Sequence, residues 1–214
     1  MVASTTSMML LLALGMLVTA LMISDERRLT RAVKIYALQS LLLATIFVAL
    51  ALSGDYYLLA WAVSAVITKT VLVPWILLRQ IKRTNAIEEK PVLGSTLTWL
   101  LSVAAIVFGF AVGWSFGRPH MIVLVGVSVS LFLIGLIQMT VRRSLIKQLL
   151  GFCHFENSSH LTLAILAPGL PETVEIGIAT DAIVLILVGS FVAYLIWRSY
   201  NTLDYTKLRL LREG

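Results

Sequence analysis

The sequence has few of the residues that soluble enzymes use for catalysis or metal binding. Its 214 residues include one cysteine and three histidines, and only 13% are charged. One cysteine excludes an internal disulfide and an iron–sulfur cluster held by this chain alone, because such clusters need several cysteine ligands. The sequence contains no Walker loop, dinucleotide-binding glycine motif, nucleophile elbow or HExxH motif. We therefore expect no active site and no cofactor or metal in this chain.

Apolar residues dominate the composition. They make up 59% of the chain, and its mean hydropathy is strongly positive. A soluble domain of this size does not need so much apolar sequence, so the composition indicates an all-α integral membrane protein. The net charge of +6 would suit nucleic acid, but the basic residues lie in short connections between apolar stretches. We therefore expect contacts with lipid and none with nucleic acid.

Seven apolar stretches predict seven transmembrane helices in a single membrane domain, residues 1–214. Each has about 17–25 residues, the length that a helix needs to cross a ~30 Å hydrocarbon core. The predicted spans are 7–24, 33–53, 56–79, 95–115, 120–141, 146–168 and 174–197.

The basic residues predict an orientation. All of the 17 Lys and Arg residues except Lys69 and Arg118 follow spans one, three, five and seven. By the positive-inside rule, the N-terminus then lies outside and the C-terminus in the cytoplasm, which requires an odd number of spans. We expect a multi-pass protein of the cell (inner) membrane.

Similar segments suggest an internal repeat of residues 1–90 and 118–214. Arg27-Arg28 and Arg142-Arg143 precede similar helix starts, and residues 67–71 resemble residues 179–183. Spans one to three and five to seven would then be parallel copies, with span four returning the chain. Chance similarity between apolar segments is the other explanation.

The stretch 147–167 is apolar at both ends and polar in the middle. In a helix, Cys153, Glu156, Asn157 and His160 share one face, because they are spaced by three and four residues. Glu156 then lies near mid-bilayer, where a carboxylate costs roughly 2.5 kcal/mol or more and must face protein or water. We predict a proton site at Glu156 with His160 as a relay. The alternative is a protonated or hydrogen-bonded glutamate that holds helices together.

Lys69 lies past the middle of span three. Pro74 follows it and cannot donate to the carbonyl group of Thr70, which predicts a loosened or kinked helix there. Lys69 is expected either to carry a proton, or to tune the pKa of a neighbour, or to form a static ion pair.

Three acidic residues belong to the last predicted span. Asp181 lies about a third of the way in from the outer side and is a second predicted proton site, with a buried structural hydrogen bond as the alternative. Glu172 and Glu175 lie at the outer mouth of this helix. They are either an exit funnel for protons or acids favoured there by the helix macrodipole.

Weaker patterns predict contacts between helices. Tyr36, Gln39 and Ser40 form a polar patch in span two that suits hydrogen bonding to another helix, and Gly126 and Ser130 form a small-residue packing face in span five.

Two longer motifs, Gly151-Phe-Cys-His-Phe-Glu-Asn-Ser-Ser-His160 and residues 171–183, resemble the hydrogenase-4 component E family, as does the segment 64–74. The similarity covers essentially the whole chain. This resemblance implies a membrane subunit of a group 4 nickel–iron hydrogenase complex, such as a formate hydrogenlyase, related to respiratory complex I. The implied partners are antiporter-like membrane subunits, a membrane protein like the H subunit of complex I, and the hydrogenase large and small subunits. The nickel–iron centre and the iron–sulfur clusters are expected in those partners.

The second half, from about Met121, also resembles the K subunit of complex I and the C subunit of Mrp-type antiporters. Arg142-Arg143, Gly151, Asn157 and residues 201–204 carry this resemblance. It implies two acids involved in proton movement, one at Asp181 and one at the position of Cys153. This chain instead has its acid one turn later, at Glu156. Either the acid has moved along the helix face or that site is lost.

We therefore expect a subunit that contributes buried ionisable residues to a proton or ion path, coupled to redox chemistry in partner subunits. Two other functions fit the sequence. One is a structural adaptor between the hydrogenase module and the antiporter-like subunits, and the other is an independent small secondary transporter.

Overall fold

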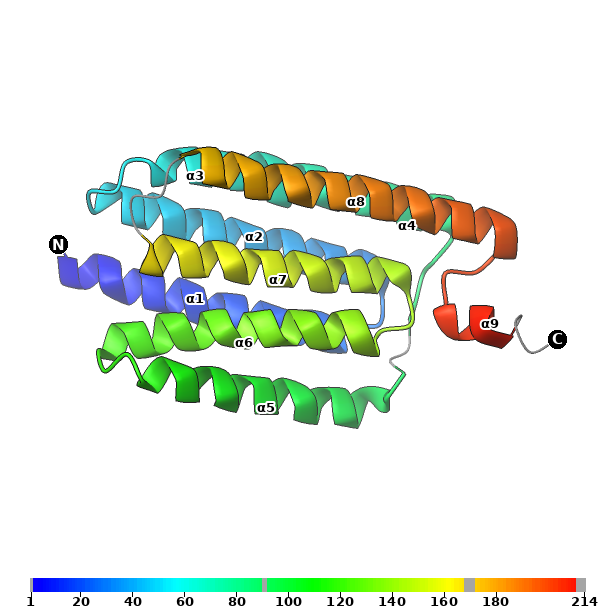
Figure 1. Cartoon of the computed structure of the whole chain (residues 1–214), viewed down its shortest axis with the longest axis horizontal. Helices are drawn as coiled ribbons and strands as arrows, with labels where there is room; N and C mark the ends of the chain where they lie inside the picture. Colours follow the sequence, from blue (N-terminus) through cyan, green and yellow to red (C-terminus); the bar gives the residue numbers. More distant parts are fainter. Residues whose placement is uncertain (1, 90–91, 168–171, 211–214) are drawn as a thin grey trace.

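The computed structural model describes residues 2–89, 92–167 and 172–210, and long helices run side by side through it (Figure 1). The elements are α1 (Val2–Asp25), α2 (Leu29–Leu52), α3 (Leu58–Ala65), the π-helix η1 (Val66–Leu72), α4 (Val73–Thr84), α5 (Gly94–Trp114), α6 (Pro119–Val141), α7 (Leu145–Leu166), α8 (Glu172–Tyr200) and α9 (Tyr205–Leu210).

Six stretches of helix within the described residues are long and apolar enough to cross a membrane. They are Thr5–Asp25, Leu29–Leu52, Leu58–Thr84, Gly94–Trp114, Pro119–Val141 and Thr180–Tyr200. The remaining long helix, α7, was predicted as span six and has a sufficient length of 22 residues. It is more polar than the other six, and more than half of its residues are buried. A helix enclosed by protein does not need an apolar surface toward lipid.

The helices form two adjacent rows. α1, α2 and the continuous rod α3–η1–α4 make one row, and α6, α7 and α8 make the other. Across the rows, α1 packs on α6, α2 on α7, and α4 on α8. α5 packs against α6 at one edge (Figure 1). This arrangement places α2 and α7 at the centre.

Glycines bring the central helices close together. A Cβ atom on Gly151 of α7 would lie 2.9 Å from the carbonyl oxygen of Gly135 on α6, and a Cβ on Gly135 would lie 2.7 Å from the Phe155 nitrogen. The predicted packing face of Gly126 and Ser130 is confirmed, because it contacts α5 in the same close manner. Small residues of this kind let helix backbones approach, and here they fix the position of α7.

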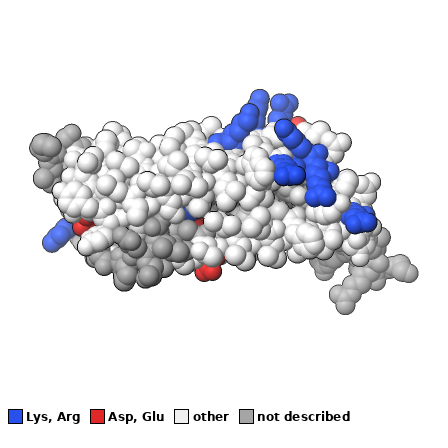
Figure 2. All heavy atoms as spheres, turned by 90° about the horizontal axis from the view of Figure 1, so that it is seen from above, with Lys and Arg blue, Asp and Glu red and all other residues white. Residues whose placement is uncertain are grey.

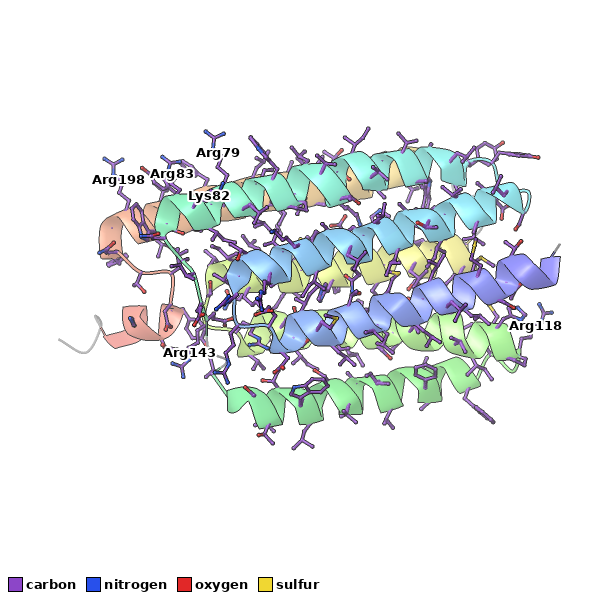
Figure 3. The ribbon with its side chains drawn as sticks, turned by 180° about the vertical axis from the view of Figure 1, so that it is seen from behind. Arg79, Lys82, Arg83, Arg118, Arg143 and Arg198 are labelled. Carbon is purple, nitrogen blue, oxygen red and sulfur yellow. The ribbon has the colours of Figure 1, made fainter. Side chains whose placement is uncertain are left out.

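The charges divide the molecule into two ends. Arg79, Lys82, Arg83, Arg143 and Arg198 lie at one end of the bundle and Arg118 at the other (Figure 3). In the space-filling view, basic atoms gather at the same end and the middle of the molecule is nearly free of exposed charge (Figure 2). We call the end that carries the five labelled basic residues the basic end.

A buried carboxylate ties the connections together at the basic end. Glu89, which precedes α5, accepts hydrogen bonds from the backbone nitrogens of Arg143 (2.7 Å) and Ser144 (3.4 Å). Its other oxygen lies 3.9 Å from Nη1 of Arg142. Glu89 and Arg142 are 6% and 1% exposed. Burial raises the pKa of Glu89, although Arg142, Lys147 and the two backbone donors act to lower it. We call this group the Glu89 clamp.

Candidate functional site

Four polar side chains meet in the interior of the bundle, in contact with one another. Lys69 Nζ lies 3.0 Å from Glu156 Oε1 and 2.8 Å from His160 Nδ1, and it donates a hydrogen bond to Asn157 Oδ1 at 3.2 Å. None of the four residues is more than 5% exposed. We call them the Lys69 cluster. The structure therefore joins three of the residues predicted from the sequence, Lys69, Glu156 and His160, into one site.

The helices position these side chains from two directions. Glu156, Asn157 and His160 project from one broad face of α7 because three and four residues correspond to one turn. Lys69 reaches them from η1, where the chain forms a π-helix just before Pro74. The predicted loosening of the helix at this point is confirmed. π-Helical turns inside α-helices are frequent at functional sites.

The polar patch of α2 supports the cluster from a third helix. Asn157 Nδ2 donates to Gln39 Oε1 and to Ser40 Oγ, both at 3.3 Å. Gln39 in turn donates to the backbone oxygen of Met16 on α1 at 3.0 Å. The predicted hydrogen bonding between helices is confirmed for Gln39 and Ser40. Asn157 is therefore held with its oxygen toward Lys69.

His160 has two alternative hydrogen-bond patterns at one atom. Its Nδ1 lies 2.8 Å from Lys69 Nζ and 3.0 Å from the backbone oxygen of Glu156. Without a proton, Nδ1 accepts from the Lys69 ammonium group. With a proton, it donates to the Glu156 carbonyl oxygen. His160 thus has two protonation states within hydrogen-bond distance of a lysine, and its Nδ1 lies 3.9 Å from the Glu156 carboxylate. Such a group is chemically suited to exchange protons with them.

Aromatic rings close the cluster on the side away from the basic end. The His160 ring lies 6.5 Å from the ring of Phe47 and 6.1 Å from that of Trp61, measured between centroids. Both aromatic residues are at most 2% exposed. They belong to a large apolar core and separate His160 from the opposite end of the bundle.

Asp181, the second predicted proton site, does not join the cluster. It lies on α8 with an exposed side chain, but it is near enough to interact electrostatically with Glu156. The side chains of Glu172 and Glu175, the expected outer mouth, lie outside the described residues. Cys153, the position implied for an acid by the resemblance to complex I, is buried one turn before Glu156.

The structure shows roles for Asn157 and Glu89 that were not predicted from the sequence. Asn157 was placed on the polar face of α7, but its contact with Lys69 depends on the packing of η1 against α7. The role of Glu89 could not be predicted from the sequence, because its main partners are backbone N–H groups, which every residue except proline has. Among the described residues, no group of three or more His, Cys, Asp or Glu side chains is placed to hold a metal ion.

Comparisons with known proteins match this chain to one family model and to three proteins of one name. The family model of NADH-ubiquinone/plastoquinone oxidoreductase chain 4L matches residues 123–213, which include Glu156, Asn157 and His160. Hydrogenase-4 component E of Escherichia coli (strain K12) is 37% identical over 202 residues, covering 92% of this chain and 94% of that protein. The proteins of the same name from Escherichia coli O157:H7 and Shigella flexneri match equally well. No solved structure gives a significant match.

Proposed function

This chain belongs to the hydrogenase-4 component E family, and from that membership and its geometry we propose a membrane subunit of a complex I-like group 4 nickel–iron hydrogenase of the formate hydrogenlyase type. In this proposal the Lys69 cluster takes up and releases protons, and redox events in partner subunits drive the exchange. One observation carries the proposal: a lysine, a glutamate and a histidine lie in mutual contact inside the bundle.

The depth of the cluster supports a role in charge movement. Lys69 and Glu156 lie near the middle of two long helices, with 1% and 5% exposure. Replacing a buried ion pair by apolar residues is often neutral or stabilising, so stability alone gives little reason to keep one. Ionisable groups at such depth are by default candidates for proton or ion paths. Asp181, within electrostatic range of Glu156, is proposed as the next acid on the path.

We further propose that α7 is a seventh span and that the basic end faces the cytoplasm. α7 has 22 residues, against 23 in α6 and 24 in α2, and it packs between α6, α2 and α8. The gathering of Lys and Arg at one end follows the positive-inside rule (Figure 3). The protein would then be a multi-pass protein of the inner membrane with its N-terminus outside.

Backbone contacts at the basic end support a duplication of residues 1–90 and 118–214. The first residue of α2, Leu29, donates from its backbone nitrogen to the carbonyl oxygen of Ile87 at 3.1 Å. The first residue of α7, Leu145, donates to Leu203 in the same way at 3.4 Å. The two donors, Leu29 and Leu145, are as far apart in the sequence as the two acceptors, Ile87 and Leu203. A shared backbone joint favours duplication over chance similarity between apolar segments.

A second feature of the same joint occurs in both halves. Asn85 follows α4 and Asn201 follows α8, and each has a left-handed backbone with φ of 52°. Asparagine is one of the few residues that adopt this conformation readily at a helix end. Each asparagine stands two residues before the acceptor described above. We propose that the two rows of helices are copies of one ancestral unit.

The partners in this proposal are the antiporter-like membrane subunits, a membrane protein like the H subunit of complex I, and the hydrogenase large and small subunits. Those partners would hold the nickel–iron centre and the iron–sulfur clusters. This chain would have no catalytic site of its own, and its contribution would be the proton-exchanging cluster.

The test is a Glu156→Gln variant of the assembled complex, reconstituted in proteoliposomes. We expect loss of proton movement with electron transfer retained, because glutamine cannot ionise, while its amide oxygen and the acceptors on Asn157 and His160 still hold the Lys69 ammonium group. Asp55→Asn, in the exposed connection before α3, is the control and is expected to behave as wild type. Unchanged proton movement in Glu156→Gln would contradict the proposal and favour a structural adaptor with a static Lys69–Glu156 pair.

A further inference from the structure

Two buried polar residues lie next to the Lys69 cluster and are not part of it. Tyr36 of α2 and His154 of α7 are both 0% exposed, and their rings lie 6.4 Å apart between centroids. Within the described part of the chain, neither ring nitrogen of His154 has a hydrogen-bond partner, and the Tyr36 hydroxyl lies beside Ser40 and Cys153 without a well-formed bond. Three polar atoms are thus left without good partners in one small region.

Such a grouping is uncommon in folded proteins. The great majority of buried polar side-chain atoms are hydrogen-bonded to protein or to ordered water. Phenylalanine or leucine would fill these positions without leaving any buried polar atom unpaired. Where protein partners are missing in a polar region, internal water normally supplies them, with about three hydrogen bonds per molecule.

Tyr36 and His154 lie to one side of the Lys69 cluster along the helix axes. Ser40 is one turn after Tyr36 on α2, and Asn157 is one turn after His154 on α7. Asn157 donates to Ser40 Oγ and accepts from Lys69. Tyr36 and His154 therefore lie one helical turn from the cluster, on its basic-end side.

Polar groups continue from the pair to the basic end. Lys147 lies two turns before His154, is 0% exposed, and interacts with it electrostatically. The Lys147 ammonium group donates to the backbone oxygen of Glu26, in the connection between α1 and α2. Toward the opposite end, Phe47 and Trp61 stand against His160. The polar groups thus run from the cluster to the basic end, whereas Phe47 and Trp61, whose only polar side-chain atom is the indole nitrogen, stand on the other side.

We propose that Tyr36 and His154 form a hydrated entry arm through which protons pass between the basic end and the Lys69 cluster. This inference rests on the proposed function of that cluster. His154 accepts a proton from water at one ring nitrogen and releases a proton to water from the other. The ring is neutral again but in its other tautomer, and a flip of the ring restores the starting tautomer before the next transfer. The Tyr36 hydroxyl orders the water between His154 and Ser40. The ionisable groups that face the arm are Lys147, Cys153 and Glu156.

Water in the arm can be tested without any measurement of activity. Hydroxyl radicals generated by an X-ray pulse modify buried side chains that have water beside them, and mass spectrometry of this subunit in the intact complex locates the modification. After each rate is divided by the intrinsic radical reactivity of its residue type, we expect Tyr36, Cys153 and His154 to be modified several-fold faster than Met16 and Phe47. The two controls are also 0% exposed and lie in the apolar core. Equal rates for both sets would overturn the entry arm.

The function of the arm is tested by Tyr36→Phe and His154→Leu in the reconstituted complex. We expect His154→Leu to slow proton movement roughly a hundredfold, the lower end of the contribution of a positioned proton-transfer group. Tyr36→Phe is expected to have a smaller effect, and His154→Gln should recover part of the rate, because an amide still binds water. Tyr56→Phe removes the same atom from an exposed tyrosine and should change nothing.

The outcomes separate the two proposals. If Glu156→Gln stops proton movement while His154→Leu and Tyr36→Phe leave it intact, the entry arm is wrong and the proposed function stands. If Glu156→Gln leaves proton movement intact, the proposed function is wrong, and the entry arm fails with it. Slowed movement in His154→Leu, with part of the rate restored in His154→Gln, supports both.

Discussion

Among the described residues, two buried carboxylates pair with a lysine or an arginine, and the surroundings of the two pairs differ in kind. In the Glu89 clamp, a carboxylate accepts hydrogen bonds from two backbone nitrogens and lies 3.9 Å from Arg142. In the Lys69 cluster, the lysine and Glu156 are 3.0 Å apart, and the lysine also contacts the side chains of Asn157 and His160. One carboxylate is bound mainly by backbone and the other by side chains.

The difference follows from where each pair lies. At the ends of helices, backbone N–H groups have no intrahelical partner and need an acceptor, which Glu89 supplies. In the middle of helices the backbone N–H groups are already hydrogen-bonded, so a carboxylate there finds only side-chain donors. Backbone donors cannot change protonation, whereas lysine, histidine and glutamate can. The Glu89 clamp is therefore suited to holding connections in place, and the Lys69 cluster to exchanging protons.

The largest expected effect comes from removing one member of the Lys69–Glu156 pair. Lys69→Met leaves the Glu156 carboxylate buried without its cation, which should destabilise the subunit by about 3–5 kcal/mol. We expect a clear loss of assembled complex, measured as the yield of this subunit with its partners after mild purification. The double variant Lys69→Met with Glu156→Gln should recover most of that yield, because no unpaired charge remains. A normal yield from Lys69→Met alone would mean that the variant holds no unpaired charge, so that Glu156 is protonated when the lysine is absent.

A smaller effect is expected from moving α7 without touching either pair. Gly151→Ala places a methyl group 2.9 Å from the carbonyl oxygen of Gly135, so α6 and α7 must separate. We expect a cost of about 1–3 kcal/mol from overpacking and a fall in proton movement, because the side chains of the Lys69 cluster depend on this packing. Gly177→Ala, where an added Cβ meets nothing within 4 Å, is the matched control. Equal melting temperatures for the two variants would contradict this account of how α7 is positioned.

The smallest expected effect is a pH dependence at the Glu89 clamp. Burial raises the pKa of Glu89, so the folded state binds this proton more tightly than the unfolded state does. The resulting stability is present below the unfolded pKa near 4.5 and is lost as the pH rises through the raised value. We expect the melting temperature of wild type, relative to Glu89→Gln, to fall over that range.

Glu88 provides the control for this measurement. It is adjacent in sequence and pairs with Arg28 at 3.5 Å, but both side chains are more than half exposed. Exposed pairs of this kind contribute about 1 kcal/mol or less, so Glu88→Gln should leave the pH profile unchanged. A constant difference between wild type and Glu89→Gln at every pH would show that Glu89 does not titrate in this range.

The sequence predicted the two regions unequally. Lys69, Glu156 and His160 were recognisable because ionisable residues stand out in apolar spans. Their mutual contact was not predictable, because it depends on the packing of η1 against α7. α7 was predicted as a span from its apolar flanks, and its polar centre is the feature that separates it from the six more apolar helices. Glu89 lies in a polar connection, where an acidic residue does not stand out from its neighbours and its role cannot be inferred.

The most direct test of the central claim is the protonation of Glu156 itself. Redox-induced infrared difference spectra of the reconstituted complex report carboxylic acid groups that gain or lose a proton when the electron donor is supplied. We expect a carbonyl stretching band that shifts in heavy water and disappears in Glu156→Gln, with the Lys69 cluster otherwise assembled. Difference spectra that are identical in wild type and Glu156→Gln would contradict the account, because Glu156 would then keep one protonation state through the redox cycle.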